Sequence, residues 1–292
     1  MTSTMPAFMD LSRSAGPLVS TQWLEEHLQD PSVVIFEVSI DPMSTAAYTS
    51  GHVPGARFVY WKDLLWHDTD REFATPDLIA KRLGELGVDE SMSIALVGDP
   101  FQFAAYTYWV LTMAGQEERC LLVDGGRRTW LAEERPLATV QTSPVAGSIH
   151  PHQGDATSRI GRDEIRTRLE GDGPLLLDMR SPEEYQGERV SPPWVAHDHG
   201  AERMGHIPGA VHLYFEDLLT DSGTLLPLEA LDQRFNTAGA TEETEVVTYC
   251  RLSHRAAFAW FVLTRILSRS NVRVYDGSWT EWGSIVGFPV EQ

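Results

Sequence analysis

One cysteine of this sequence stands in a setting suited to nucleophilic chemistry. Cys250 comes at the end of an apolar stretch and shortly before a second one that begins at Ala256. Arginines follow it at positions 251 and 255. The backbone N–H groups of a first helical turn and two guanidinium charges favour a thiolate over a thiol. The pattern predicts a reactive thiol at the junction of a strand and a helix.

The composition limits the classes of function that fit the chain. With 292 residues, of which 42% are apolar and 22% charged, it is long enough for two globular domains. The net charge of −19 argues against binding to nucleic acid or to an anionic membrane surface. An anionic substrate would therefore need a locally cationic pocket. Two cysteines form no disulfide framework, which suits a reducing compartment.

No segment predicts export or a membrane anchor. The stretch from Met1 to Ser20 has no basic start followed by an apolar run, so we expect no secretory signal. The most apolar stretch, from Ala256 to Leu267, is too short to span a bilayer and contains Arg265. We therefore expect a cytoplasmic protein without a membrane partner.

The sequence contains an internal repeat, with three motifs returning in the same order at nearly constant spacing. The three pairs of segments are 51–56 with 205–210 (Gly-His-Val/Ile-Pro-Gly-Ala), 104–111 with 256–263, and 123–130 with 275–282. Two homologous halves follow from this pattern. The region from Arg135 to Ile160 is rich in Pro, Ser, Thr and Gly and lacks an apolar period. We expect a first domain over 1–138, a linker over 139–159 and a second domain over 160–292.

Each half alternates short apolar strands with amphipathic helices. The expected strands are 33–38, 94–97, 121–123, 175–178, 246–249 and 272–275. The expected helices are 21–28, 76–86, 104–113, 162–169, 228–238 and 256–267. This order predicts the α/β class, with a mainly parallel sheet and helices on both faces in each domain. Ligands of such sheets bind beyond the carboxyl ends of the strands, and Cys250 follows one of these ends.

The two halves differ at the position of the thiol. Asp99 stands in the first half where Cys250 stands in the second, and the loop of the first half is one residue shorter and carries no cation. A carboxylate cannot replace a thiolate as a nucleophile. We expect only the second half to be catalytic, and the first to be a partner domain that helps shape the site.

The second half also carries an insertion, from about Gln186 to Met204. The interpretations are an exposed or interdomain loop, or a flap over the active site. His197 and His199 lie in it without a further ligand pattern, so we expect no metal site.

With the repeat and the Cys250 loop in hand, the chain resembles the tandem-domain rhodaneses, which are thiosulfate and mercaptopyruvate sulfurtransferases. The resemblance covers almost the whole chain. It is carried by the segments 178–185 (Asp-Met-Arg-Ser-Pro-Glu-Glu-Tyr), 205–210, 250–255 and 275–282 (Tyr-Asp-Gly-Ser-Trp-Thr-Glu-Trp). In that family the second domain carries the cysteine and the first is degenerate.

The resemblance implies double-displacement sulfur transfer without a cofactor. Cys250 would take the outer sulfur of a small anionic donor as a persulfide, and cyanide or a thiol would remove it. Backbone N–H groups of the loop, with Leu252, Ser253 and His254, would form a nest for the persulfide. Three arginines would bind the donor: Arg180, Arg251 and Arg255.

Several residues keep alternative interpretations. Arg180 could instead pair with Glu183 or Glu184, and Arg251 and Arg255 could be solvated loop charges. His254 could be a loop residue or a proton shuttle, and Trp279 could wall the site or belong to the core. Many thiosulfate-type loops have glycine where this chain has Ser253, so a positive φ there would bring strain or a different loop path.

Arg251 favours thiosulfate as the donor, because a cation fits a doubly charged donor better. The alternative donor is 3-mercaptopyruvate, with the same nucleophile. Less favoured are a non-catalytic binding module and a cysteine phosphatase. The phosphate loops of those enzymes place five residues between cysteine and arginine, one more than separate Cys250 from Arg255.

Overall fold

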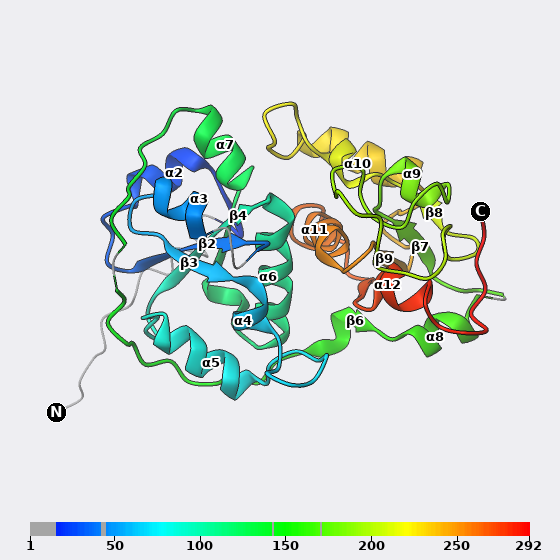
Figure 1. The fold of residues 1–292 in the computed structure, drawn as a ribbon, viewed down its shortest axis with the longest axis horizontal. Coiled ribbons are helices and arrows are strands. Elements are labelled where there is room, and N and C mark those ends of the chain that lie inside the picture. Colours follow the sequence, from blue (N-terminus) through cyan, green and yellow to red (C-terminus); the bar gives the residue numbers. More distant parts are fainter. Residues whose placement is uncertain (1–15, 42–44, 142, 170) are drawn as a thin grey trace. The chain divides into compact units, whose positions relative to one another are not determined.

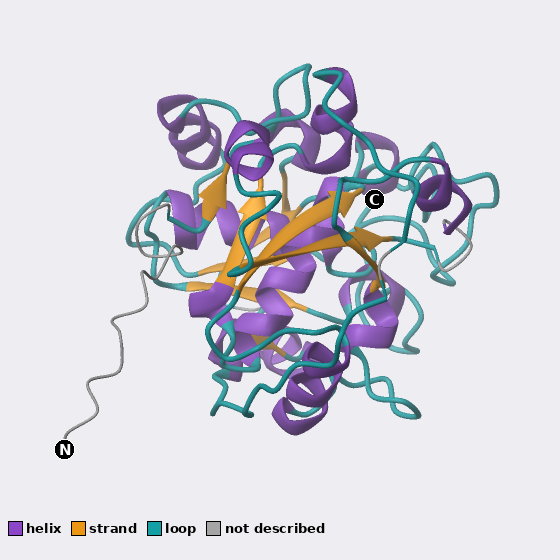
Figure 2. Ribbon diagram, turned by 90° about the vertical axis from the view of Figure 1, so that its left-hand side faces the viewer, coloured by secondary structure: helices purple, strands orange, loops and turns teal. Residues whose placement is uncertain are grey.

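The computed structural model describes residues 16–41, 45–141, 143–169 and 171–292. The chain forms two compact units, the first ending at Gly154 and the second running from Asp155 to Gln292. In each unit helices flank a sheet, in agreement with the predicted α/β class (Figures 1 and 2). The prediction about a secretory signal falls mostly on residues 1–15, which lie outside the described residues.

The first unit has a five-stranded parallel sheet in the order β1-β5-β4-β2-β3. Its strands are β1 (Leu18–Val19), β2 (Val33–Ser39), β3 (Arg57–Tyr60), β4 (Ser93–Asp99) and β5 (Cys120–Val123). Its α-helices are α2 (Thr21–Glu26), α3 (Thr45–Ser50), α4 (Trp61–Leu65), α5 (Pro76–Glu85), α6 (Phe101–Met113) and α7 (Gly126–Ala132). Alternate strand residues such as Ile35 and Ala95 pack in one cluster with Leu24 of α2 and Trp130 of α7.

The second unit repeats this arrangement in the order β6-β10-β9-β7-β8, again parallel. Its strands are β6 (Arg159–Ile160), β7 (Leu175–Asp178), β8 (Val211–His212), β9 (Val246–Tyr249) and β10 (Val272–Tyr275). Its α-helices are α8 (Arg162–Thr167), α9 (Pro182–Tyr185), α10 (Leu228–Thr237), α11 (His254–Phe261) and α12 (Ser278–Trp282). One core cluster joins the sheet to α8 and α12 through Ile165, Trp279 and Trp282.

The predicted strands are all present within one or two residues, because each is a short buried apolar run. The predicted helix over 256–267 differs in two ways. It begins earlier, at His254, and after Phe261 it continues as a π-helical turn over Val262–Ile266. His254 therefore belongs to the first turn of α11 rather than to the loop.

The region predicted as a linker, 139–159, divides between the two units at Gly154. Its first part packs on the first unit through backbone donors. Gly147 N–H donates to Gly84 O at 2.9 Å, and the N–H groups of Ser148 and His150 donate to the carboxylates of Asp89 and Glu90. The first compact unit is thus longer than the predicted domain 1–138.

Nowhere in the described ranges is a helix both long and apolar enough to cross a membrane. For the part of the chain before residue 16 the structure gives no description.

The amino ends of β9 and β10 are tied to α8 through a carboxylate with two arginine partners. Glu245 accepts from Arg168 Nη1 at 2.7 Å and from Arg273 Nη2 at 2.6 Å. The hydrogen bond from Arg168 is the main cause that lowers the pKa of Glu245 from 4.5 to about 2. A lowered carboxyl pKa stabilises the folded state above pH 4.5, and this contribution is lost as the pH falls towards 2.

We therefore expect Glu245→Gln to destabilise the protein at pH 7 by roughly 1 kcal/mol, the size of a partly exposed ion pair. The difference from the wild type should shrink between about pH 4.5 and pH 2. Urea unfolding at a series of pH values measures this. A difference that stays constant with pH would contradict the assignment.

Candidate active site at the carboxyl ends of the second sheet

Cys250 follows β9 directly, at the carboxyl end of the sheet, and is 1% exposed. The start of α12 holds its backbone on both sides. Cys250 N–H donates to Ser278 Oγ at 3.1 Å, and Cys250 O accepts from Trp279 N at 2.9 Å. Helix α11 begins four residues later and has no acidic residue in its first turn. The thiol therefore lies before a helix N-terminus whose partial positive charge favours an anion.

Ser253 has the left-handed backbone conformation, with the positive φ considered from the sequence for this position. Its φ is 69° and its ψ −17°, and it precedes the first residue of α11. Its hydroxyl contacts the Asp276 carbonyl oxygen and also Asp276 Oδ1, at 2.9 Å. These hydrogen bonds offset the steric cost of about 1–2 kcal/mol that a side chain meets at positive φ. The loop thus accommodates serine and is tied to the end of β10.

Ser278 is a second residue with positive φ beside the cysteine. Its φ is 50°, and its hydroxyl accepts from Cys250 N–H while it donates to Tyr275 O at 2.8 Å. The matching residue of the first half is Gly126, with φ 55°. In the first half, which has no cysteine at this site, a glycine adopts the positive φ. Sequence reasoning missed Ser278, although comparing the two halves could have pointed to it.

Arg255 lies in the first turn of α11 with its charge paired. It is 4% exposed and makes a bidentate ion pair with Glu184, at 2.6 and 2.9 Å. Burial by itself would lower the pKa of Arg255, but the Glu184 carboxylate outweighs it and raises the pKa. Glu184 also closes a capping box at the start of α9 with Ser181. This buried carboxylate was not predicted as the partner of Arg255.

Arg180 is fully buried at the end of β7. Its guanidinium pairs with Asp178, with Nη2 to Oδ2 at 2.6 Å, and donates to Gly205 O at 2.7 Å. It lies over the ring of Trp279, 4.6 Å from the centroid. Burial opposes the charge of Asp178, but Arg180 holds the pKa of this carboxyl below its usual value. The alternative partners Glu183 and Glu184 are not used, and the donor-binding role of Arg180 stays a prediction.

The first unit builds the same bridge with an arginine from another element. Glu37 of β2 has the sheet position of Asp178 and pairs with Arg127 of α7, at 2.5 Å. Arg127 also donates to Gly51 O at 2.5 Å, as Arg180 does to Gly205 O. In both units an arginine thus links the buried carboxylate of the strand to the glycine that opens the repeated turn. In the second unit Trp279 occupies the position of Arg127 and packs in the core.

Arg251 differs from the other two arginines. Among the described residues it contacts no carboxylate at ion-pair distance, and its Nε and Nη2 donate to His199 O at 3.2 and 2.9 Å. Burial first, and then repulsion from Arg255, lower the pKa of Arg251. Arg251 follows Cys250 directly in the chain, and Arg255 is the second residue of α11. Arg251 is thus a cation held by a carbonyl rather than neutralised by an acid.

The insertion lies against the catalytic loop and is built into the second unit. His199 O contacts Arg251, and Trp279 Nε1 donates to Arg203 O at 3.0 Å. Asp198 accepts from Val190 N and from Ser191 N, each at 2.9 Å. The side chains of Asp198, His199 and Glu202 are exposed, as in the interpretation of an exposed loop, while backbone carbonyls of the 198–203 part contact Arg251 and Trp279.

The surroundings of Asp99 and of Cys120 differ from those of Cys250. Asp99 lies 3.5 Å from Arg127 Nε, and burial raises its pKa. Burial also raises the pKa of Cys120 to about 12, and its thiol donates to Gln116 O. Cys120 is therefore a protonated core residue at neutral pH.

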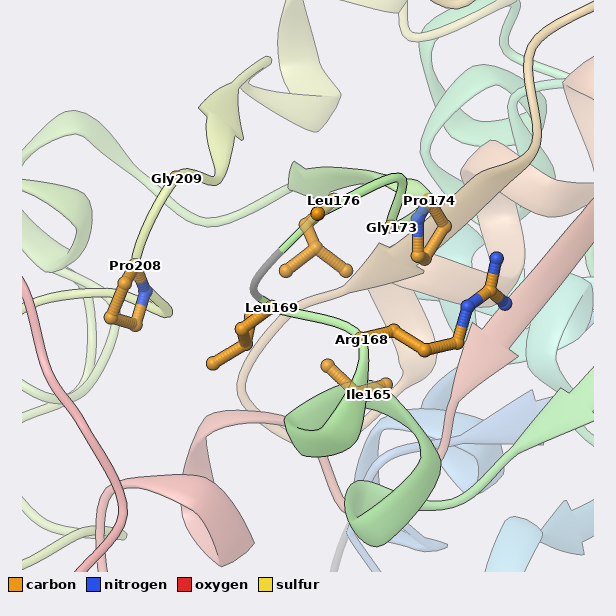
Figure 3. A pocket seen from close by; sticks show the side chains of 9 residues that line it. Ile165, Arg168, Leu169, Gly173, Pro174, Leu176, Pro208 and Gly209 are labelled. Atoms are coloured by element: carbon orange, nitrogen blue, oxygen red, sulfur yellow. The ribbon is translucent and has the colours of Figure 1, made fainter.

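The second unit also has a small pocket away from Cys250. The pocket has a volume of about 110 Å³ and lies between Ile165, Leu176 and Pro208 (Figure 3). It is next to residues that precede β7 and β8, at the opposite end of the sheet from Cys250. No group of three His, Cys, Asp or Glu side chains in the described ranges could hold a metal ion.

Comparison with known proteins gives a family for this arrangement. The model of the rhodanese-like domain matches the chain twice, over residues 20–133 and 161–285. The chain belongs to the rhodanese-like family. Both matches agree with the duplicated sheets, and the second contains Cys250 and its loop.

Curated relatives match over nearly the whole length. The "Sulfur carrier protein TtuD" of Thermus thermophilus is 37% identical over 278 residues, covering 94% of this chain and 95% of the relative. The "Putative thiosulfate sulfurtransferase" of Saccharopolyspora erythraea is 36% identical over 275 residues, with coverage of 94% and 95%. A crystal structure of the anaerobic ergothioneine biosynthesis enzyme of Chlorobium limicola has a TM-score of 0.76 at 22% identity. It covers 99% of this chain and 72% of that one, and shows a shared fold.

The two arginine bridges predict similar losses of stability. Arg180→Ala and Arg127→Ala should each lower the free energy of unfolding by roughly 3–5 kcal/mol, because each leaves a buried carboxylate unpaired. Arg162→Ala, which removes a half-exposed ion pair with Glu281, is the control and should change it by at most about 1 kcal/mol. Chemical denaturation measures all three. An Arg180→Ala protein of normal stability with a raised donor KM would instead make Arg180 a donor ligand.

The left-handed loop residue predicts an order among Ser253 variants. Ser253→Ala keeps the positive φ but loses the hydrogen bonds, whereas Ser253→Gly loses them but removes the strain. We expect the alanine variant to be less stable than the glycine variant by roughly 1–2 kcal/mol and slower in sulfur uptake. Thermal unfolding and single-turnover kinetics measure this. An alanine variant equal to the glycine variant would refute the account of the loop.

Proposed function

We propose that this protein is a sulfurtransferase that moves a sulfane sulfur from thiosulfate to cyanide or another thiophilic acceptor through Cys250. The observation that carries the proposal is Arg251, a cation without a carboxylate partner among the described residues, beside a buried cysteine before a helix N-terminus. The names of the curated relatives, a sulfur carrier and a thiosulfate sulfurtransferase, support it.

The proposed reaction has two balanced steps. The Cys250 thiolate attacks the outer sulfur of thiosulfate, the S–S bond of the donor breaks, and sulfite leaves with the bonding electron pair. Cys250 then carries a persulfide. The acceptor attacks the outer sulfur of this persulfide, so that cyanide gives thiocyanate and the Cys250 thiolate returns.

The residues around Cys250 serve the first step by their charges. Arg251 would bind the sulfonate oxygens of the donor and neutralise the sulfite that leaves. Arg255, paired with Glu184, and the N-terminus of α11 would favour the anionic persulfide. Arg180 could reach a donor only through Nη1, which is buried and has no hydrogen-bond partner in the described structure. No step requires a separate general base if Cys250 reacts as a thiolate.

Thiosulfate is proposed over 3-mercaptopyruvate because of Arg251. A donor with two negative charges and three terminal oxygens gains more from an uncompensated guanidinium than a monocarboxylate does. The cellular acceptor is left open, because cyanide and thiols would attack the same persulfide.

A two-donor comparison tests the proposal. The wild type should have the higher kcat/KM for thiosulfate. Arg251→Ala should lower it at least about tenfold, the loss expected for a hydrogen bond to a charged group, and should lower the value for mercaptopyruvate less. Steady-state assays with cyanide as acceptor measure both.

Cys250→Ser is the control, since it is nearly isosteric and should abolish turnover with both donors at an unchanged melting temperature. A wild type that prefers mercaptopyruvate would contradict the proposed donor. Activity that remains in Cys250→Ser would contradict the mechanism.

A further inference from the structure

The insertion is anchored to the second unit at its carboxyl end. The Arg203 guanidinium donates to four backbone carbonyls around the end of α12, those of Trp282, Gly283, Ile285 and Phe288, at 2.6–3.1 Å. The carbonyl of Arg203 accepts from Trp279 Nε1, and Trp279 N–H donates to Cys250 O. One chain of hydrogen bonds thus joins the insertion to the cysteine.

A second group of hydrogen bonds holds Asp198, the residue just before the segment that contacts Arg251. Asp198 Oδ1 accepts from the N–H groups of Val190 and Ser191 and from Ser191 Oγ, each at 2.9 Å. Ser191 is fully buried. Residues 199 and 200 therefore lie between two fixed points, Asp198 and Arg203, only a few residues apart.

His199 and Gly200 make the contact with Arg251. Both Nε and Nη2 of Arg251 donate to the His199 carbonyl. Gly200 has a φ of +120°, and a Cβ there would lie 2.6 Å from Nε and 2.7 Å from Nη2 of Arg251. Only glycine fits this backbone conformation and this close approach. The glycine lets the carbonyl reach the Nε edge of the guanidinium.

A carbonyl oxygen can orient Arg251 without neutralising its charge, which a carboxylate would do. It fixes the plane of the guanidinium through two hydrogen bonds and brings no negative charge into direct contact with it. Nη1 is used by no hydrogen bond within the described residues, so it can bind an oxyanion. An acid in the place of His199 O would neutralise the charge, as Glu184 does for Arg255.

We propose that the insertion is the specificity element of the site, and that Gly200 is a positioning residue that orients Arg251 for small dianionic sulfur donors. This inference rests on the proposed function and explains how the site would select its donor. The first half has a shorter loop without a cation, and it lacks the insertion. The cation and the element that orients it thus occur together in the half that has the thiol.

Gly200→Ala tests the proposal, with Gly171→Ala as its matched control. Gly171 has a similar φ of +106° in the same unit, but a Cβ there would meet nothing within 4 Å. Thiosulfate binding is measured by calorimetry in the Cys250→Ser background, where no turnover occurs. Gly200→Ala should weaken binding at least about tenfold and raise the thiosulfate KM of the active enzyme similarly, with kcat within about twofold. Gly171→Ala should change neither.

A coupling measurement separates positioning from a general loss of structure. In the Arg251→Ala background Gly200→Ala should have no further effect on the thiosulfate Kd, because its effect passes through Arg251. The attack of cyanide on a preformed persulfide should also be unchanged. If Gly200→Ala does not fold, Arg203→Lys serves instead, since one ammonium group cannot bind all four carbonyls of the anchor, and this variant should raise the KM in the same way.

The outcomes distinguish the two proposals. A Gly200→Ala protein that binds thiosulfate as the Gly171→Ala protein does, or an effect that persists without Arg251, would overturn the role of the insertion. So would a Cys250→Ser protein that binds no thiosulfate. If thiosulfate binds through Gly200 and Arg251 but Cys250 takes up no sulfur, the proposed function fails and the positioning role stands.

Discussion

A buried charge must be paired, and this requirement governs both halves of the molecule. Each sheet carries a buried carboxylate at the same position of its strand, Glu37 of β2 in the first unit and Asp178 of β7 in the second. An arginine neutralises each and also binds the glycine carbonyl that opens the repeated turn. An unpaired buried ion would lower the free energy of unfolding by several kcal/mol, so the fold around the site requires both pairs.

The same requirement explains why the three arginines near Cys250 are not equivalent. Arg180 and Arg255 have their own carboxylates, which allows them to be almost fully buried. Arg251 has only a carbonyl as a hydrogen-bond partner, and it alone of the three makes no ion pair among the described residues. The chain carries a net charge of −19, so a local cation is what an anionic donor requires. Two of the arginines thus have carboxylate partners, and in the proposed function the third would bind the donor.

The duplicated frame shows how one half could lose or gain catalysis with little change elsewhere. Tyr185 and His206 stack in the second unit as Tyr48 and His52 do in the first, with ring centroids 3.9 and 4.0 Å apart. The differences are concentrated in the loop after the central strand, in the insertion, and in the residue that begins the last helix, Ser278 instead of Gly126. In the proposed function, catalysis would therefore depend on a few loop residues held by a common scaffold.

The sequence predicted those parts of the structure that leave a local signal. Buried strands are apolar runs, so six of them were found within one or two residues. The strands that were not predicted are β1, β6 and β8, with two residues each, and β3, in which only Val59 is buried. Cys250 was placed at a strand end by its flanking segments. Glu184 lies 71 residues from its partner Arg255 in the chain, so no local signal could point to it. Asp178 lies only two residues from Arg180, but Glu183 and Glu184 were equally good candidates by position in the sequence. The contact of His199 with Arg251 spans 52 residues, and no spacing rule predicts it.

The central claim, that Cys250 carries the sulfur, is tested most directly by mass spectrometry of the protein after brief exposure to thiosulfate. The account predicts one added sulfur atom, on the peptide that contains Cys250, and none on the peptide with Cys120, whose burial keeps it a thiol. The added sulfur should disappear when cyanide is supplied. A folded protein that gains no sulfur on Cys250, or gains it on Cys120, would contradict the account.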